Sequence, residues 1–370
     1  MTVRLRLLTA GDPEAMTGGH LYQRRMAEAA PAHGFEVRFA ALRPAPAAVQ
    51  LLSTRGLLRS AAGHGFAALL LDSIAAAWAA PWLRGRGTEV PVIGVVHQPP
   101  GGLEAGPALR PLLRGLDLAA YRRADLLIVT GEPVAEQLLR SGVARGRLRV
   151  VTPGVMRGPN GRPAPDLRRG RRAALLCVAN WQRRKGLEHL LAAVAGLPPE
   201  DVTLHLVGDP EAEPDHGAEL LRRLRAPELS DRVVVHGVLP QERVRALYLG
   251  ADAFVLPSVE EPYGMVYAEA LAAGLPVVGW RSGNLPRLVE SGVEALLAEP
   301  GDTVALAACI RRLAEDGTLR GAMAEAARRR GARLPTWQDS AAAFFSAVRE
   351  ALAQRRGAPV RRREALKSSE

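Results

Sequence analysis

The chain has 370 residues, of which 48% are hydrophobic and 24% charged, the composition of an ordinary globular protein long enough for two domains. Its longest apolar run, from Phe66 to Leu83, is interrupted by Asp72 and is typical of a buried strand and helix, so no membrane span is expected. The two cysteines, Cys177 and Cys309, lack the spacing of a disulfide framework or a metal site, which favours a cytoplasmic location.

The net charge of +11 is unevenly distributed along the chain. The first 172 residues contain 24 arginines and 12 acidic residues, whereas the remainder contains 25 basic and 26 acidic residues. Two interpretations remain open: an arginine-rich solvated surface, or a surface that meets an anionic partner such as the inner face of a membrane. Nucleic acid is not expected as a partner, because aromatic residues make up only 4% of the chain and no recognition motif is present.

Short apolar strands alternate with segments of helical periodicity along the whole chain. In the first half, strands are predicted at residues 3–9, 37–40, 67–72, 92–96, 125–129 and 148–151. In the second half, strands are predicted at residues 174–178, 203–207, 233–236, 253–256, 277–279 and 295–297. This alternation is typical of parallel sheets with helices on both faces, so the sequence predicts an α/β protein with two doubly wound, Rossmann-like domains.

A stretch rich in proline and glycine, with little apolar periodicity, separates the two halves. We therefore predict an N-terminal domain at residues 1–160, a linker at 161–172 and a C-terminal domain at 173–335. A last helix is predicted at 336–353, packing back toward the N-terminal domain, and a basic tail at 354–370.

The segment from Glu261 to Glu269 holds two carboxylates with a proline and a glycine between them. It follows a predicted strand, so it should lie at the carboxyl end of a parallel sheet, where ligands bind. Gly264 permits a backbone turn that leaves the amides of Met265 and Val266 free at a helix start, and carboxylates accept hydrogen bonds from neighbouring sugar hydroxyls. The alternative, solvated acids on a helix surface, fits poorly in so apolar a segment. The pattern indicates a site for a nucleotide sugar.

A basic stretch, Arg183, Arg184 and Lys185, follows the first strand of the second half at a predicted helix start. Cations there oppose the helix dipole and call for a compensating anion. A bound diphosphate would supply that anion, because lysine and arginine both bind phosphate well. The alternative is a solvated basic loop.

Two features of the first half also follow predicted strands. Gly18 and Gly19 precede a helix, so the backbone there could approach an anionic ligand closely. His97 ends another strand and is placed for a ligand site. Taken alone, the glycine pair is as readily part of an ordinary loop, and His97 is more readily a loop histidine with a local hydrogen bond.

With these motifs in the same order along nearly the whole chain, the sequence resembles the retaining glycosyltransferases of family 4. These enzymes have the GT-B architecture, in which two Rossmann-like domains face an interdomain cleft. The segment from Pro257 to Val278, with its two carboxylates, is the specific part of the resemblance. The individually weaker matches are Gly18-Gly19, His97, Val151-Thr152-Pro153-Gly154-Val155, Arg184-Lys185-Gly186, Val207-Gly208-Asp209 and His236-Gly237.

The resemblance implies roles for residues of the second half. Glu269 would bind the ribose hydroxyls of the donor, and Glu261 would contact hydroxyls of the transferred sugar. The backbone amides near Gly264 and Met265, together with Lys185, would hold the diphosphate.

In the first half, the resemblance implies that Gly19 approaches the diphosphate and that His97 faces the sugar near its anomeric carbon. The chain departs from the family at Asn180, where an arginine is usual, and either Arg183 or Arg184 would replace that cation. The candidate catalytic residues are Glu261, His97 and Lys185.

The predicted activity is transfer of a sugar from a nucleotide diphosphate sugar to an acceptor hydroxyl with retention at the anomeric carbon, and with no cofactor. Because no Asp-x-Asp sequence occurs, no essential metal is predicted. The acceptor is not identified; the basic first half favours an anionic or lipid-linked one. Alternatives on the same architecture are a nucleotide-sugar epimerase, a phosphorylase and an inactive binding module. A phosphorylase is disfavoured because it needs a pyridoxal lysine, and the chain has only Lys185 and Lys367.

Overall fold

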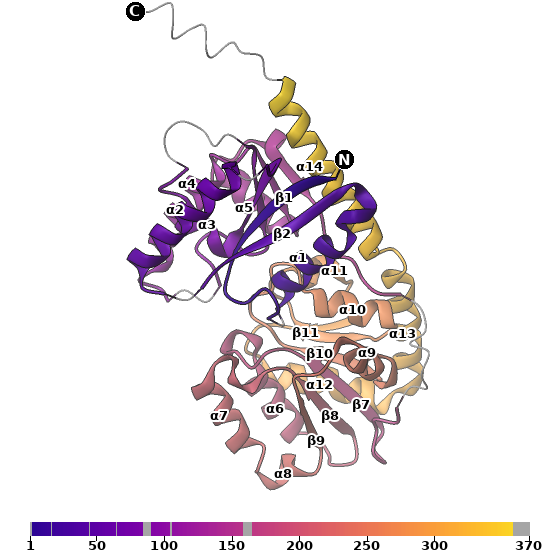
Figure 1. Cartoon of the computed structure of the whole chain (residues 1–370). Coiled ribbons are helices and arrows are strands. Elements are labelled where there is room, and N and C mark those ends of the chain that lie inside the picture. Colours follow the sequence, from indigo (N-terminus) through magenta and orange to yellow (C-terminus); the bar gives the residue numbers. More distant parts are fainter. Residues whose placement is uncertain are drawn as a thin grey trace, which may run out of the picture. The chain divides into compact units, whose positions relative to one another are not determined.

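The computed structural model describes residues 2–15, 17–43, 45–63, 65–83, 90–103, 106–157 and 165–357, and its chain divides into two units (Figure 1). The first unit comprises Met1–Gly154 and Trp337–Glu370, and the second comprises Val155–Thr336. Each unit contains a six-stranded sheet in which all strand pairs are parallel. The predicted α/β class with two Rossmann-like domains is therefore confirmed. Because residues 158–164 lie outside the described part, the linker at 161–172 stays a prediction.

The sheet of the first unit has the strand order β2-β1-β3-β4-β5-β6. Its strands are β1 (Val3–Ala10), β2 (Phe35–Leu42), β3 (Ala68–Asp72), β4 (Val92–Val96), β5 (Leu126–Val129) and β6 (Leu148–Val150). Its helices are α1 (Gly18–Ala29), α2 (Ala47–Gly63), α3 (Ser73–Ala79), α4 (Arg110–Tyr121), α5 (Glu132–Arg140) and α14 (Trp337–Gly357). Every residue of β3, β4 and β5 is buried, as expected for central strands covered on both faces.

Two separate apolar cores lie on the two faces of this sheet. Helices α2, α3, α4 and α5 contribute to one core, and α1 and α14 to the other (Figure 1). In the second core, Phe344 and Phe345 of α14 pack with Tyr22 and Met26 of α1. Helix α14, the last helix of the described residues, is therefore an integral part of the first unit.

The sheet of the second unit has the strand order β12-β11-β10-β7-β8-β9. Its strands are β7 (Ala173–Val178), β8 (Val202–Val207), β9 (Val233–Gly237), β10 (Ala253–Leu256), β11 (Val277–Trp280) and β12 (Ala295–Ala298). Its helices are α6 (Leu187–Ala195), α7 (Pro214–Arg223), α8 (Pro227–Ser230), α9 (Gln241–Gly250), α10 (Met265–Ala273), α11 (Leu285–Leu288), α12 (Thr303–Glu315) and α13 (Gly317–Gly331). In chain order this is the doubly wound arrangement, in which the winding direction reverses between β7 and β10.

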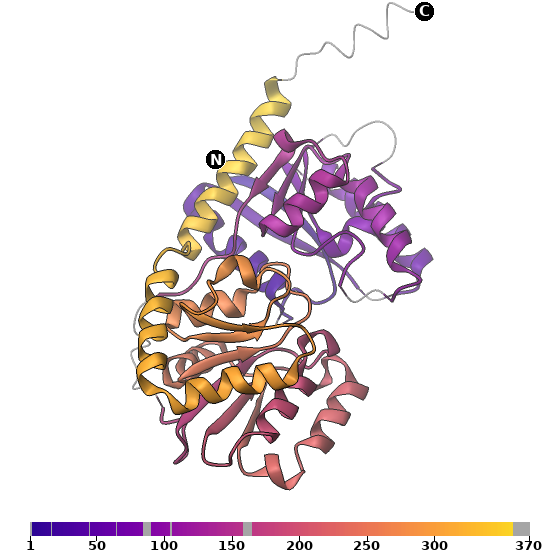
Figure 2. The same ribbon diagram turned by 180° about the vertical axis from the view of Figure 1, so that it is seen from behind.

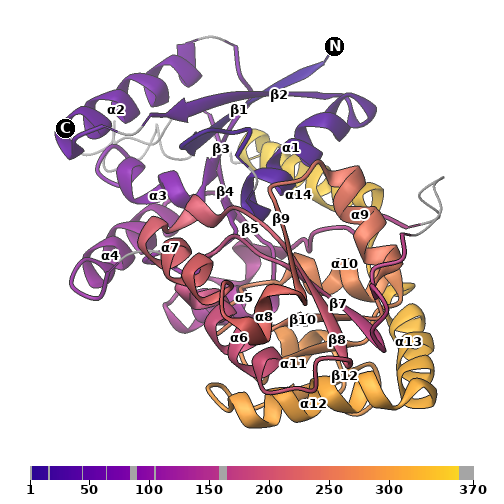
Figure 3. The ribbon, with the colours of Figure 1, turned by 90° about the horizontal axis from the view of Figure 1, so that it is seen from below.

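Helices cover both faces of the second sheet as well. Helix α6 packs against α8 and α12, whereas α10 packs against α9 and α13 on the other side (Figure 3). Seen from behind, the orange helix α12 lies along the strands β11 and β12 (Figure 2). Helices thus cover both faces of the sheet, so a ligand site can form only at its edges or at the ends of its strands.

Each predicted strand is found, with bounds that differ by at most two residues. The predicted helix start at Arg183 is wrong: Arg183 to Lys185 form a short 3₁₀ turn, η3 (Arg183–Lys185), and α6 begins only after Gly186. The reason is the left-handed conformation of Gly186, which separates the turn from the helix. No helix within the described ranges combines the length and the apolarity needed to cross a bilayer.

Candidate active site

The two predicted motifs of the second half meet at the point where the winding direction reverses. Strands β7 and β10 are direct neighbours, with Leu176 paired to Phe254. The loop after β7 leads to η3, and the loop after β10 leads to the start of α10. Connections on the two sides of such a point diverge to opposite faces of the sheet, which leaves a crevice for a ligand at the carboxyl ends of the strands.

An ion pair between Lys185 and Glu261 joins the two loops. The ammonium of Lys185 donates to Glu261 Oε1, and the two side chains are only 12% and 11% exposed. The hydroxyl of Ser258 donates to the same oxygen at 3.1 Å, and Nη1 of Arg184 lies 3.7 Å from it. Glu261 is therefore a nearly buried carboxylate held by two cations and a hydroxyl.

The backbones of the two loops approach each other at Gly186, which has φ of +67°. A Cβ atom at this position would lie 2.2 Å from the carbonyl oxygen of Pro257. Beside this contact, the amide of Val259 donates to the carbonyl of Arg184 at 2.8 Å. Glycine is required here both by the left-handed backbone and by the space available.

Neighbouring cations of η3 point in different directions. Arg183 is 57% exposed and pairs with Glu213 at 3.3 Å and Glu219 at 3.0 Å. Arg184 instead donates to a backbone carbonyl of the second loop, 3.3 Å away, and lies beside Glu261. Arg183 and Arg184 are the two candidates for the missing family arginine. The structure places Arg184 beside Glu261, the partner of Lys185, whereas Arg183 points toward acidic residues elsewhere.

The start of α10 presents an uncapped helix terminus. Gly264 precedes the helix with φ of +81°, and no side chain of the described residues caps it. The amides of Met265 and Val266 make no hydrogen bond to the described residues, because the first α-helical donors in this helix are Tyr267 and its successor. Such a terminus favours an anion.

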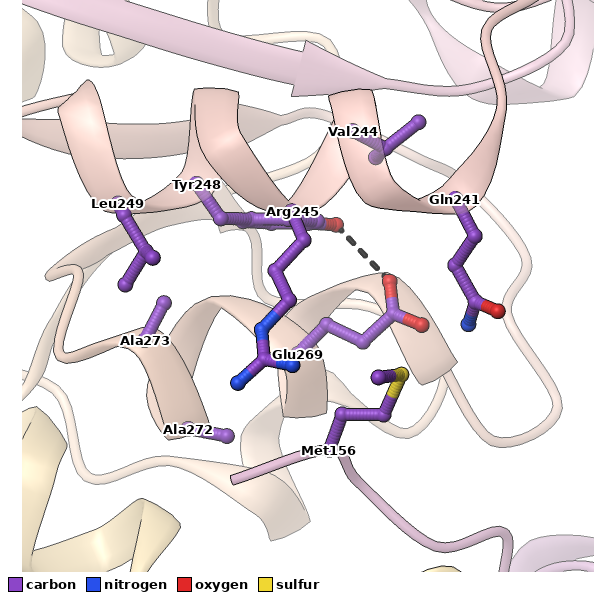
Figure 4. Close-up of a pocket in the computed structure, with 9 residues that line it drawn as sticks. All are labelled: Met156, Gln241, Val244, Arg245, Tyr248, Leu249, Glu269, Ala272 and Ala273. Atoms are coloured by element: carbon purple, nitrogen blue, oxygen red, sulfur yellow. Dashed lines mark hydrogen bonds between the residues drawn. The ribbon is translucent and has the colours of Figure 1, made fainter. Parts of the chain in front are cut away.

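Glu269 lies further along α10, in a pocket between α9 and α10 (Figure 4). The hydroxyl of Tyr248 lies 3.2 Å from its carboxylate, and the guanidinium of Arg245 reaches over the same pocket (Figure 4). The pocket is lined by Met156, Gln241, Val244, Arg245, Tyr248, Leu249, Glu269, Ala272 and Ala273. Apolar walls with a few polar groups are typical of a site that orients a small ligand.

In the first unit, Gly19 and His97 lie against each other. A Cβ atom on Gly19 would be 3.5 Å from the ring of His97, which is ordinary van der Waals contact. Gly18 begins α1, and the hydroxyl of Thr17 caps this helix. The backbone amide of His97 donates to Ser73 Oγ at 3.3 Å, and burial lowers the pKa of its imidazole. The strand ends of β1 and β4 thus bring the predicted residues of this half together.

The sequence prediction missed two buried acids of the first unit, one linked to His97 through Ser73 and one bonded to the loop that follows it. Asp72 ends β3 and accepts a hydrogen bond from Ser73, whose hydroxyl also holds His97. Asp117 on α4 accepts from the amide of Gly101 at 2.9 Å and so ties down the loop after His97; burial raises the pKa of its carboxyl to about 6. Asp72 could have been found as the one charge in the longest apolar run, whereas Asp117 looks like a surface residue of an amphipathic helix.

Comparison with known proteins identifies the family. The model described as "Glycosyl transferase 4-like domain" matches residues 2–154, and "Glycosyl transferases group 1" matches residues 172–316. The D-inositol 3-phosphate glycosyltransferase of Corynebacterium jeikeium is 31% identical over 290 residues, which are 74% of this chain and 67% of that relative. The protein of the same name from Acidothermus cellulolyticus is 32% identical, and the match covers 65% of this chain but only 56% of that longer relative.

Solved structures agree on the fold. Sucrose-phosphate synthase from Thermosynechococcus elongatus has a TM-score of 0.79 at 24% identity, covering 95% of this chain and 100% of that one. Anabaena HepE in complex with UDP-glucose has a TM-score of 0.72 at 20% identity, covering 92% and 99%. The chain belongs to the group 1 glycosyl transferases and has the two-domain GT-B fold. The resemblance to family 4 is therefore confirmed, and the protein is a glycosyltransferase.

Proposed function

We propose that the protein transfers a sugar from a nucleotide diphosphate sugar to an acceptor hydroxyl with retention at the anomeric carbon. The observation that carries this proposal is the meeting of Lys185, Arg184 and Glu261 beside the uncapped start of α10. Cations and free amides suit a diphosphate, and a carboxylate suits sugar hydroxyls, so one crevice offers both halves of such a donor. The binding of UDP-glucose by HepE, a protein of the same fold, supports this donor class.

In the proposed reaction, the bond between the anomeric carbon and the phosphate oxygen breaks while the acceptor oxygen bonds to the same face of that carbon. The acceptor's proton passes to the leaving phosphate, so no further base is required. Negative charge grows on the diphosphate, and Lys185, Arg184 and the amides of Met265 and Val266 stabilise it electrostatically. Glu261 accepts hydrogen bonds from the sugar.

The remaining contacts are proposed from the family pattern and the local geometry. Glu269 binds the ribose in the pocket beside Tyr248, where its carboxylate is already oriented. Gly19 and His97 of the first unit contact the diphosphate and the transferred sugar. Arg184, and not Arg183, takes the place of the family arginine missing at Asn180.

The acceptor is proposed to be anionic. The first 172 residues have twice as many arginines as acidic residues, 24 against 12. The name of the relative from Corynebacterium jeikeium, D-inositol 3-phosphate glycosyltransferase, also contains an anionic group. A basic surface raises the local concentration of such an acceptor.

Thermal unfolding in the presence of nucleotide diphosphate sugars tests the donor class. A true donor should raise Tm, because a ligand at 100 times its Kd adds about 2.7 kcal/mol to the free energy of unfolding. In Glu269→Gln the rise at the same donor concentration should be smaller, since a neutral amide is a weaker acceptor for ribose hydroxyls. If no nucleotide diphosphate sugar changes Tm, the proposed function is wrong.

Transfer should survive exhaustive chelation. The described part of the chain has no group of three or more His, Cys, Asp or Glu side chains that could hold a metal, and the proposed charge stabilisation uses cations of the protein. We expect the rate with EDTA and after metal removal to match the untreated rate. A loss of transfer that Mg²⁺ or Mn²⁺ restores would contradict this prediction.

A membrane contact is proposed for the first unit, through the N-terminal half of α4. Leu109 and Leu112 are 51% and 61% exposed there, and Arg110 and Arg114 are exposed beside them. Apolar side chains flanked by arginines suit an anionic lipid surface. The protein should sediment with vesicles containing phosphatidylglycerol and not with neutral ones, and Arg110→Glu with Arg114→Glu should abolish sedimentation. The exposed-site variant Val304→Gln serves as control; equal binding by all variants would refute the contact.

A further inference from the structure

A buried amide lies beside the histidine of the first unit. Gln23, on α1, is 1% exposed, and its Nε2 lies 3.4 Å from Nε2 of His97. Its Oε1 has no hydrogen-bond partner among the described residues. Burying an amide whose oxygen has no hydrogen-bond partner costs free energy of folding. The placement of Gln23 beside a candidate catalytic histidine therefore needs an explanation.

The orientation of this amide decides which ring nitrogen carries the proton. As oriented, one N–H of Gln23 donates to Nε2 of His97, which must then be unprotonated, and the oxygen and the second N–H have no partner among the described residues. The opposite orientation would leave both N–H groups of a buried amide without an acceptor. Since unpaired buried N–H groups are rarer than under-used carbonyl oxygens, the first orientation is favoured.

The rest of the surroundings fixes the ring but does not choose its tautomer. The ring meets Tyr22 edge-on, with centroids 5.1 Å apart, and lies against Gly19. Its backbone amide is held by Ser73. Nδ1 of His97 makes no hydrogen bond to the described residues. It is also not one of their fully buried polar atoms that lack a partner, so it is accessible to a ligand.

We propose that Gln23 is a positioning residue that holds His97 as the neutral Nδ1–H tautomer, with Nδ1–H directed to the substrate. Among the described residues, the titratable groups that act on this ring are Tyr22, which meets it edge-on, and Asp72 and His20, whose charges influence it. Only the second half of the proposal, donation of Nδ1–H to a sugar oxygen, rests on the proposed function. The first half concerns the free protein and can be tested without any donor.

The tautomer can be read by long-range ¹H–¹⁵N NMR on the full chain labelled with ¹⁵N-histidine. The chain has eight histidines, and the His97→Ala spectrum identifies the signal of His97. In the unaltered protein we expect a protonated Nδ1 and an unprotonated Nε2. In Gln23→Leu the ratio of tautomers should fall about fivefold, the effect of losing one ordinary hydrogen bond. In Gln23→Glu the carboxylate should reverse the tautomer.

A matched control is Met26→Leu, a second buried position of α1, which should leave the His97 signal unchanged. A protonated Nε2 in the unaltered protein, or an unchanged tautomer ratio in Gln23→Leu, would overturn the proposal. Transfer assays then separate the two halves. If the tautomer ratio shifts in Gln23→Leu and kcat falls while KM for the donor is unchanged, both halves of the proposal are supported. If the tautomer ratio shifts and transfer is unaffected, the donation of Nδ1–H to the substrate is wrong and only the tautomer assignment is kept.

Discussion

Lys185→Met is expected to lower the rate of sugar transfer about a hundred- to a thousandfold. In the proposed reaction, the ammonium of Lys185 lies where charge grows on the leaving diphosphate, and losing one such preorganised donor typically costs this much. The side chain is only 12% exposed, so bulk water cannot replace it efficiently. Initial rates with saturating donor and acceptor measure the effect.

The same substitution should also lower the free energy of unfolding, by about 1–3 kcal/mol, because Glu261 loses its main partner in a nearly buried position. Adding Glu261→Gln to Lys185→Met removes the carboxylate charge that has lost its main partner. The double variant should therefore regain most of the lost stability, measured by urea unfolding, while its transfer rate stays at least as low as that of Lys185→Met. This pattern separates a catalytic loss from a folding defect.

Arg183→Met provides the matched control. Arg183 lies in the same turn but pairs with Glu213 and Glu219 at the surface, so its loss should change the transfer rate less than tenfold. Equal losses in Arg183→Met and Lys185→Met, or full activity in Lys185→Met, would show that the proposed phosphate site is wrong.

Gly186→Ala is expected to cost about 3 kcal/mol of folding stability and to abolish transfer. The left-handed backbone accounts for roughly 1–2 kcal/mol. The rest arises because the new Cβ would stand 2.2 Å from the Pro257 carbonyl oxygen, and relieving this overlap costs typically 1–3 kcal/mol. The relief must move the two loops apart, which separates Lys185 from Glu261.

Gly301→Ala is the control for the backbone contribution alone. Gly301 has φ of +87° and no atom within 4 Å of the added Cβ, so it should lose about 1–2 kcal/mol and keep full activity. Urea unfolding of both variants and donor binding by calorimetry measure the difference. Similar costs in the two variants would mean that the loops can separate freely.

Much of the fold could be predicted from the sequence because central parallel strands are apolar throughout. The strands β4 and β10, which are fully buried, were predicted with their observed bounds. The edge strand β2, with its mixture of buried and exposed residues, was predicted too short at both ends.

The orientation of side chains in the site could not be predicted in this way. Arg183 and Arg184 are adjacent and chemically identical, and only the acids Glu213 and Glu219, far along the chain, determine which one turns away. Gln23 was missed for a related reason. A polar residue in an amphipathic helix pattern reads as a surface position until the elements that bury it are known.

The contribution of α14 to the first unit has a consequence for synthesis of the chain. Phe344 and Phe345 complete the core around Tyr22 and Met26, yet they leave the ribosome only after all of Val155–Thr336. The second unit is continuous in sequence and can fold as soon as it emerges, since domains generally fold as units. The first unit must wait with one apolar face uncovered, so the part synthesised first is the part finished last.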